Sequence, residues 1–399
     1  MRYRDFQLML VGKIFGWMAM HMVMIAVALQ VWEETKDHWN LALIGLSAFA
    51  PAMGLALFTG YVADLFDRKK VIAVCYVVIG LSAALLLLVT LTGFSNVWHV
   101  FGILALLGTG RAFYQPAANS LVPNLVPAHI FPNAVAWHTS TNKICQTVGP
   151  ALRGLVYEIF SPAAVYGSAA AGLGIGLVTV LFIRTRTTRE GREPTTLRVL
   201  LAGLVYVYEK KVIFGAITLD LFAVLLGGVT ILLPVYAIDI LQVGPAGAGF
   251  LRSAMAAGSL VTGLALTLVT MDRAVGKILY VMVIIYGAAT VLFGLSELYW
   301  LSLTAMVIIG AADMVSVYIR VTLVQIATPD EMRGRVSAVN SVFTGASNEL
   351  GESRAGAMAA LIGTVPAVVF GGLGAIAVTL ACWRLFPDLT RVERMDRAL

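Results

Sequence analysis

Charged residues are scarce in this chain of 399 residues: 13% are Asp, Glu, Lys or Arg, and 59% are hydrophobic. A soluble domain carries about 25% charged residues, so the composition excludes an ordinary soluble protein and indicates an integral membrane protein. Cysteine is rarer still. Cys75, Cys145 and Cys382 fall far apart in separate apolar stretches. They offer no metal-ligand spacing, and we expect them to act as small apolar fillers.

Motifs that bind nucleotides or catalytic metals are also missing. The sequence has no G-x-x-x-x-G-K-[ST] loop, no HExxH pair and no Cys/His cluster. An ATP-driven pump or a membrane enzyme would need such parts, so we expect no enzymatic activity and no cofactor. Energy would then come from an ion gradient, and buried carboxylates suit protons.

Apolar stretches long enough to cross a membrane fill most of the chain. A spanning helix needs about 20 residues. The first stretch is too long for a secretory signal and has no convincing small-residue cleavage site. We therefore expect an all-α membrane protein with twelve transmembrane helices over residues 6–32, 42–62, 71–92, 97–117, 134–157, 163–183, 212–236, 247–271, 278–295, 300–319, 336–361 and 365–386.

The basic residues outside these stretches predict the orientation. If the N-terminus is cytoplasmic, nearly all of them fall on the cytoplasmic side, and only Lys36 falls on the opposite side. This strong positive-inside bias predicts a multi-pass protein of the cell inner (cytoplasmic) membrane with both termini in the cytoplasm. It also accounts for the net charge of +6 without a nucleic-acid partner.

The chain reads as two similar halves. Residues 184–211 are charged and then carry leucines at helical spacing, which predicts a cytoplasmic linker with a short amphipathic helix. The linker separates an N-terminal six-helix half, residues 1–183, from a C-terminal six-helix half, residues 212–399. Residues 149–154 match residues 351–356, and 162–167 match 366–371. Such repeats are how many transporters achieve alternating access.

Charged side chains inside the predicted spans are costly unless they face a partner or a water-filled path. They are Lys13, Arg111, Lys143, Arg153, Asp220, Arg252, Asp313, Arg320, Glu349, Glu352 and Arg354. The repeat aligns Arg111 with Asp313, and a similar alignment sets Lys13 near Asp220, so the first half is basic where the second is acidic. Either these charges line an asymmetric cavity for a polar solute, or they form ion pairs that only hold the halves together.

Four acidic residues are candidates for proton coupling: Asp220, Asp313, Glu349 and Glu352. Glu349 and Glu352 lie one helical turn apart, and two carboxylates in a low dielectric cannot both ionise cheaply. The alternative for Asp220 and Glu349 is structural pairing, and for Glu352 it is solvation at the outer interface.

Polar residues of several spans are candidates for lining a substrate cavity. They are Lys13, Arg111, Tyr114, Gln115, Asn142, Lys143, Gln146 and Asn348. An Arg beside aromatic and amide groups suits a planar polar ligand, and Lys143 would attract an anionic or catecholate-like solute. Helix packing for the aromatic residues and hydration of the first turns of span five are the alternatives.

The loop after the second span resembles the motif G-x-x-x-D-R-x-G-R-[RK] of the major facilitator superfamily. The matching residues are Gly60, Asp64, Arg68 and Lys69. Leu65 and Asp67 depart from the motif. In that family the loop forms a cytoplasmic latch whose basic residues bridge to the other half, so the resemblance implies a latch here. Asp272 and Arg273 remain of a second copy in the other half.

Residues 149–154, GPALRG, resemble the GPxxGG motif associated with exporters of the same superfamily. Gly149, Pro150 and Gly154 fit the motif, and they would let span five pack closely and bend. Arg153 stands where the motif has Gly. It either extends to the outer interface or meets a carboxylate such as Glu158 or Glu352.

Further segments resemble the branch of the superfamily that includes enterobactin exporters: residues 111–117, 121–127, 219–225, 232–237 and 347–352. The resemblance implies the major facilitator fold and a secondary active exporter of a small organic solute, siderophore-like or drug-like, exchanged for protons by alternating access. The alternatives are an uptake symporter or facilitator of the same fold, and a receptor or scaffold that does not transport. The expected partners are the solute and the lipid bilayer, and a monomer is the family expectation.

Overall fold

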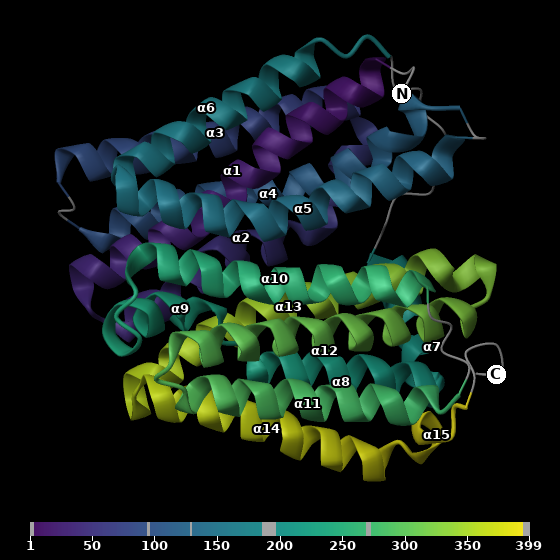
Figure 1. Cartoon of the computed structure of the whole chain (residues 1–399). Coiled ribbons are helices and arrows are strands. Elements are labelled where there is room, and N and C mark those ends of the chain that lie inside the picture. Colours follow the sequence, from purple (N-terminus) through teal and green to yellow (C-terminus); the bar gives the residue numbers. More distant parts are fainter. Residues whose placement is uncertain (1–3, 94–95, 128–129, 186–196, 269–272, 394–399) are drawn as a thin grey trace. The chain divides into compact units, whose positions relative to one another are not determined.

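The computed structural model describes residues 4–93, 96–127, 130–185, 197–268 and 273–393 (Figure 1). These residues form helices joined by short connections. Two compact units are present. Unit 1 comprises Met1–Lys36, Leu43–Thr196 and Gly244–Gly249, and unit 2 comprises Asp37–Ala42, Leu197–Val243 and Phe250–Leu399.

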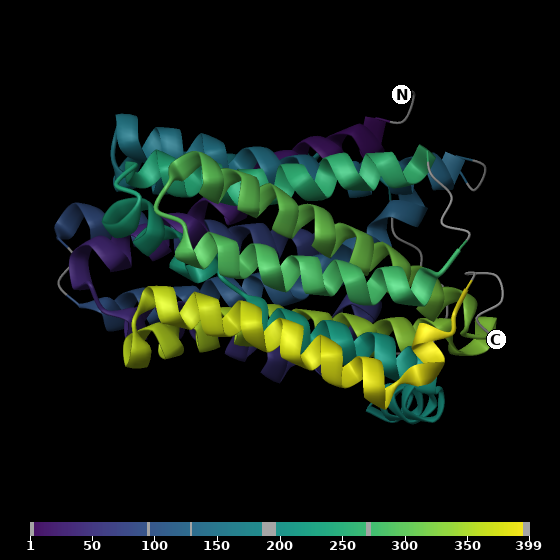
Figure 2. The same cartoon turned by 60° about the horizontal axis from the view of Figure 1, so that its bottom comes forward.

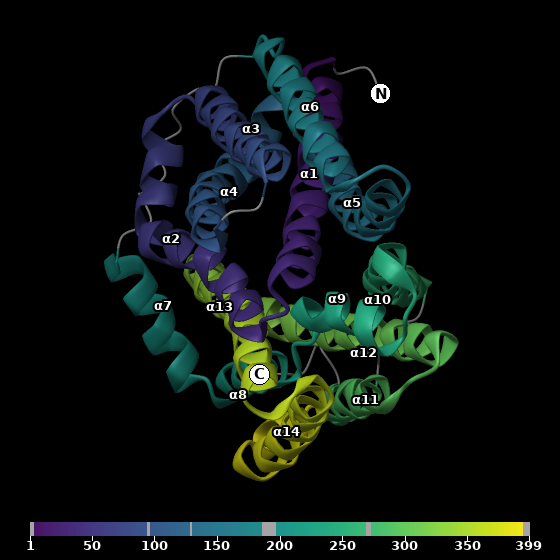
Figure 3. The ribbon, with the colours of Figure 1, turned by 90° about the vertical axis from the view of Figure 1, so that its left-hand side faces the viewer.

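Unit 1 is built from the first six helices. They are α1 (Arg4–Thr35), α2 (His38–Leu65), α3 (Arg68–Thr92), α4 (Val97–Leu125), α5 (Phe131–Ile159) and α6 (Pro162–Leu181). Helix α6 packs along both α1 and α3, α3 packs against α4, and α5 packs against α1, as the end-on view in Figure 3 shows.

Unit 2 repeats this packing. Its elements are α7 (Leu197–Glu209), α8 (Lys211–Gly227), η2 (Thr230–Leu232), α9 (Leu233–Val235), η3 (Tyr236–Ile240), α10 (Gly244–Leu268), α11 (Val275–Leu295), α12 (Tyr299–Ile326), α13 (Asp330–Ile362), α14 (Thr364–Leu385) and α15 (Pro387–Thr390). The first turn of α10, Gly244–Gly249, belongs to unit 1. Helix α14 packs along α8 and α11, α11 against α12, and α13 against α8 (Figure 2). The relations of α1, α3, α4, α5 and α6 thus recur in α8, α11, α12, α13 and α14, as expected for pseudo-symmetric halves.

Equivalent glycines make very close helix contacts in the two units. A Cβ on Gly108 of α4 would lie 1.9 Å from the backbone oxygen of Ala48, and one on Gly310 of α12 would lie 1.8 Å from that of Met255. The two glycines are paired by the same offset that aligns residues 149–154 with 351–356. Small residues at such crossings let helix backbones approach closely in a membrane.

Nine helices of the described residues are long and apolar enough to cross a membrane. They are α1, α3, α4, α6, the segment Lys211–Ile240, α10, α11, α12 and α14. Helices α2, α5 and α13 are as long, with 28, 29 and 33 residues, but are not among the nine. The number of twelve spans and the orientation of the termini remain predictions.

The seventh predicted span, residues 212–236, lies within the candidate span Lys211–Ile240, but this span is not one continuous helix. Helix α8 ends at Gly227, Gly228 has extended backbone angles, and the chain continues through a 3₁₀ turn, a short α-helical turn that includes Pro234, and the π-helical turn η3. Glycine and proline explain the break, because Gly is a weak helix former and Pro lacks a backbone N–H.

The leucine-rich end of the predicted linker forms helix α7, which belongs to unit 2. The Tyr206 hydroxyl donates to the backbone oxygen of Ala327 at 3.1 Å, and Gly203 lies directly against the backbone of Arg335. Figure 3 shows α7 beside α8. The charged stretch 186–196 of the linker lies outside the described residues.

Candidate transport site

The second unit holds a buried ion pair. Arg320 on α12 donates from Nη2 to Oδ2 of Asp220 on α8 at 3.0 Å, and the two side chains are only 3% and 6% exposed. Asp220 lies in the middle of α8, and its neighbours along the helix are mostly apolar. The pair therefore satisfies two charges that would be costly alone in the membrane.

Arg320 also contacts a third helix. Its Nη1 donates to Oδ1 of Asn340 at 2.7 Å and to the Thr344 hydroxyl at 3.2 Å, both on α13. One guanidinium thus joins α8, α12 and α13. A planar group with several fixed donors is suited to hold three elements together in this way. Its Nε has no hydrogen-bond partner among the described residues.

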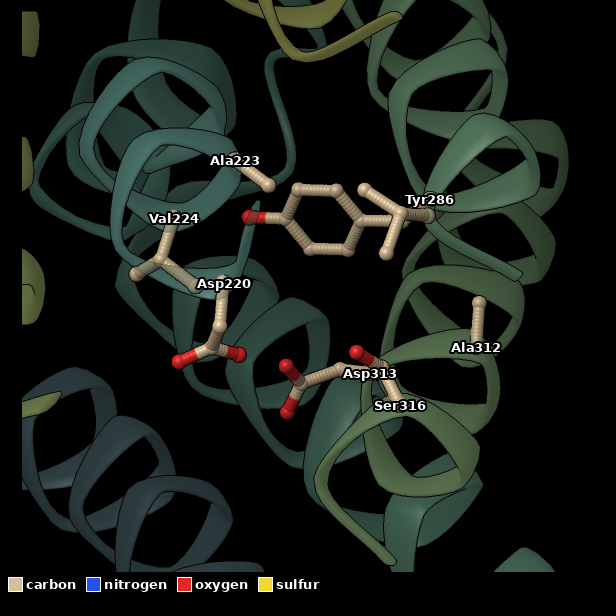
Figure 4. A pocket seen from close by; sticks show the side chains of 8 residues that line it. Asp220, Ala223, Val224, Tyr286, Ala312, Asp313 and Ser316 are labelled. Atoms are coloured by element: carbon tan, nitrogen blue, oxygen red, sulfur yellow. The ribbon is translucent and has the colours of Figure 1, made fainter. Parts of the chain in front are cut away.

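A small cavity lies beside this pair (Figure 4). Its polar lining consists of the carboxylates of Asp220 and Asp313 and the hydroxyls of Tyr286 and Ser316. The space open to the centre of a water-sized sphere is about 10 Å³, which is close to what one water molecule requires. The cavity is therefore far too small for an organic solute, but it suits a water or a proton.

The cavity brings groups from three helices together. Figure 4 shows the carboxylates of Asp220 on α8 and Asp313 on α12 approaching the same space, and the Tyr286 hydroxyl of α11 extending across it toward α8. The structure thus places two of the four predicted proton-coupling residues in one polar cluster.

Two further arginines of unit 2 bind the broken segment after α8. Arg354 of α13 donates to the backbone oxygen of Leu226, and Arg252 of α10 donates to the Thr230 hydroxyl. The last carbonyl groups of a helix have no partner within it. Arg354 supplies such a partner, so these two intramembrane charges have a structural explanation in the break.

The first unit contains a buried lysine. Lys13 of α1 is 3% exposed, and its Nζ donates to the backbone oxygen of His138 on α5 at 2.8 Å. Cys145, one helical turn or more further along α5, directs its Sγ at the backbone oxygen of Ile14 at 3.7 Å. Lys13 is thus placed between α1 and α5, within the interior of its unit.

Aromatic residues connect the same part of α1 to α3 and α4. The Tyr76 hydroxyl donates to the backbone oxygen of Gly12 at 2.9 Å and lies 3.1 Å from the Tyr114 hydroxyl. The Tyr114 ring stacks on Trp17 with 6.0 Å between centroids. Tyr114, predicted to line a cavity, is therefore buried in a helix interface of unit 1, whereas Gln115 beside it is exposed.

The other predicted cavity and coupling residues lie elsewhere on the same helices. Arg111 is half-buried on α4, and Glu349 and Glu352 are half-buried on α13. Asn348 is exposed, and its amide donates to the backbone oxygen of Thr344 in its own helix. The side chains of Asn142, Lys143 and Gln146 on α5 lie outside the described part of the chain.

The predicted latch is described in part. Arg68 donates to Asn124 at the end of α4 at 2.8 Å, and Lys69 donates to the backbone oxygens of Leu181 and Ile183 after α6. Asp67, the residue that departs from the motif, caps the N-terminus of α3. These contacts hold unit 1 together.

The structure describes little of the remaining residues of the predicted latch. The surroundings of Gly60, the side chain of Asp64 and all of Asp272 lie outside the described part of the chain, while Arg273 is exposed. A bridge between the halves through this loop remains a prediction.

The span-five motif makes the close contact that its glycines suggest. A Cβ on Gly154 would lie 3.0 Å from the Cα of Ala246, and one on Gly249 would lie 2.5 Å from the backbone oxygen of Pro150. Glu158 accepts from the backbone N–H of Ala246 at 2.9 Å. Gly149 is buried against α1. The side chain of Arg153 lies outside the described residues.

Sequence reasoning missed several residues of these clusters. Tyr286, Asn340 and Thr344 of unit 2 and His138 of unit 1 were not assigned contacts. Asn340 and Thr344 are spaced by one helical turn within a span rich in Ser, Thr and Asn, and this polar stripe was the available signal. Arg320 was noticed only as a buried charge.

Solved structures of membrane transporters share this fold. The nucleoside transporter NupG superposes with a TM-score of 0.77 at 14% identity, covering 96% of this chain and 100% of NupG. A peptide transporter POT superposes with a TM-score of 0.78 at 12% identity, covering 98% of this chain and 96% of that one. The superpositions show that this chain shares the fold of these transporters.

The family follows from the sequence comparison. Residues 1–398 match the family described as transmembrane secretion effector, and the chain belongs to it. The enterobactin exporter EntS of Escherichia coli O1:K1 / APEC is 25% identical over 396 residues, which cover 98% of this chain and 93% of that protein. EntS of Shigella boydii serotype 18 is 24% identical over 394 residues with the same coverage.

These findings confirm the main predictions on class. The protein is a multi-pass transporter of the bacterial inner membrane, it acts on a small-molecule substrate, and it is not an enzyme.

Proposed function

We propose that this protein is a secondary active exporter that moves a small organic solute out of the cytoplasm by alternating access, in exchange for protons. The observation that carries the export direction is the likeness to enterobactin exporters over 98% of the chain. The energy source is inferred from the cavity that Asp220 and Asp313 share with Tyr286. No bound cofactor is required by this scheme.

The proposed substrate is siderophore-like or drug-like. The similarity of this chain to enterobactin exporters supports a siderophore as the substrate. The intramembrane charges of the first half, Lys13, Arg111, Lys143 and Arg153, are all basic, and basic residues attract anionic or catecholate-like solutes. The solute would be held by groups outside the small cavity of unit 2, because that cavity has room only for water.

Proton exchange is assigned to the carboxylates of the second half. A buried carboxylate can bind a proton at little cost because burial disfavours its charged form. Asp220 and Asp313 lie at the cavity, and Glu349 and Glu352 are half-buried on α13. Protonation of Asp220 would weaken its pairing with Arg320, which also binds α13, so proton binding and a helix rearrangement would be coupled through one guanidinium.

Efflux of enterobactin from cells that express the chain tests the proposal. We expect efflux above that of cells without the chain, and we expect a protonophore to abolish it. Asp220→Asn and Glu349→Gln should remove gradient-driven efflux while enterobactin still binds, because the amides cannot exchange a proton. Asp388→Asn, at an exposed carboxylate of α15, is the matched control and should leave efflux intact.

The alternatives give different results. Chain-dependent accumulation of the solute would identify an uptake symporter or facilitator, and binding without flux would identify a receptor. Efflux by the amide variants equal to that of the unmodified chain would remove these carboxylates from proton coupling.

A further inference from the structure

Lys13 is a buried lysine. No acidic residue of the first half lies at a similar distance from the ends of the helices. The acidic residues before position 184 are Asp5, Glu33, Glu34, Asp37, Asp64, Asp67 and Glu158. All of them lie in the first or last turn of a helix or in a connection. Lys13 follows the start of α1 by nine residues, which places it about 13 Å along that helix.

The described contacts of Lys13 are made by uncharged groups. From α5, the carbonyl group of His138 accepts from Nζ, the Nε2 atom of His138 is buried with no partner among the described residues, and Cys145 approaches nearby. Lys143 is on the same helix, with a side chain outside the described residues. From α3 and α4, the phenols of Tyr76 and Tyr114 lie beside this position and bond to each other. The Cys75 thiol is buried next to Tyr76 on α3, and Arg111 of α4 is a half-buried cation, so neither helix adds an acidic partner.

Helix α6 contributes no acidic partner either. It approaches α1 so closely that a Cβ on Gly12 would lie 2.4 Å from the Thr179 hydroxyl. Its one ionisable residue, Tyr166, donates to Gln30 near the other end of α1. Lys13 is therefore held in a tightly packed position with one uncharged acceptor, where an ammonium is costly and a neutral amine is much less so.

We propose that Lys13 is a second proton-exchanging group of this transporter, in addition to the carboxylates of the other half. Its neutral amine takes up one proton from the outer solution to become an ammonium, and the ammonium releases that proton to the cytoplasm later in the cycle. An N–H donates to His138 in both states, so the side chain keeps its place while its charge changes. This inference rests on the proposed exchange of solute for protons.

Two substitutions separate this role from that of an anion-binding charge. Lys13→Arg keeps the positive charge, but a guanidinium does not release its proton in a protein. Lys13→Met keeps the apolar stem without the amine. We expect both variants to bind enterobactin and to lose protonophore-sensitive efflux. Lys36→Arg, at an exposed lysine that contacts the Trp32 ring, is the matched control and should transport normally.

Efflux by Lys13→Arg equal to that of the unmodified chain would overturn the proposal, because it would show that a permanent charge suffices. The larger Arg could also disturb packing in this tight position. The loss of efflux counts only for variants that elute as a single folded species in detergent, and Lys13→Met, which is no larger than lysine, provides the second variant.

A substrate-independent measurement completes the test. In protein labelled with ¹³C at the ε-carbon of its eight lysines, the signal absent from Lys13→Met belongs to Lys13. We expect this signal to report a change of ionisation state within the pH range in which ordinary lysines stay charged. A Lys13 signal that stays in one ionisation state would overturn the proposal. If the unmodified chain exports no enterobactin, the proposed function fails, yet this signal still decides the role of Lys13.

Discussion

Arg320 joins three helices of the second unit through polar contacts of one side chain. It binds Asp220 of α8 and both Asn340 and Thr344 of α13, and its side chain is almost fully buried. A buried pair of this kind is not by itself evidence of stability, because desolvation of two charges offsets much of their attraction. Removing one partner alone is a different matter, since it leaves the other charge buried and unpaired.

Arg320→Gln is therefore expected to destabilise the protein by about 3–5 kcal/mol. The double variant Arg320→Gln/Asp220→Asn should recover most of that loss, because no isolated charge is left. The midpoint of thermal unfolding in detergent measures both effects. Equal midpoints for the single and double variants would show that the pair is not what stabilises this region, and Arg391→Gln, at an exposed pair with Asp388, is the control with little expected change.

The sequence identifies the buried charged residues of the candidate site better than it identifies the residues that they contact. Asp220, Arg320 and Lys13 stand out because a charge within an apolar stretch is rare and costly. Their contacts could not be read from spacing, because Asp220 and Arg320 are separated by 100 residues and meet only when α8 packs near α12. The role of Tyr286 could not be anticipated either, since aromatic residues in spans most often only pack.

At the scale of helices, apolar runs and glycines predict well where a helix lies in the sequence, but they predict poorly whether that helix is continuous. The predicted spans fall on helices throughout the described residues. The break after Gly227 was missed because the flanking residues are as apolar as a continuous span. The break is stabilised by contacts from other helices, namely Arg354 to Leu226 and Arg252 to Thr230, and a pattern along one segment does not contain such contacts.

The glycines of α4 offer a test of helix packing. Gly108→Ala would place a Cβ 1.9 Å from the backbone oxygen of Ala48, so one of the two helix backbones must shift. We expect a clear loss of folded protein and a lower midpoint of thermal unfolding. Gly102→Ala in the same helix meets nothing within 4 Å and should be neutral or stabilising by about 0.5–1 kcal/mol.

The same comparison extends to unit 2, where Gly310→Ala meets the backbone oxygen of Met255. If the helices of the two halves cross at equivalent glycines, Gly310→Ala should lower the yield of folded protein and the midpoint of thermal unfolding about as much as Gly108→Ala. Normal yield and stability for both variants would contradict the close approach at these positions.

At the scale of the whole molecule, the charges within the predicted spans do not balance. Seven are basic and four are acidic, and no acidic residue falls within the predicted spans of the first half. Two of the basic residues, Arg252 and Arg354, bind the broken segment after α8, and Arg320 is paired with Asp220. The unbalanced positive charge therefore belongs mainly to the first half.

This imbalance predicts a preference for anionic solutes. A negatively charged solute would offset positive charge that is costly in a low dielectric, whereas a cationic solute would add to it. We expect an anionic catecholate such as enterobactin to be exported and to be inhibited by other anions of similar size, with little effect of the cationic dye ethidium. Arg111→Gln should reduce this preference, because it removes one of the basic residues. Equal export of ethidium and enterobactin would contradict the prediction, since a site with excess positive charge cannot favour both equally.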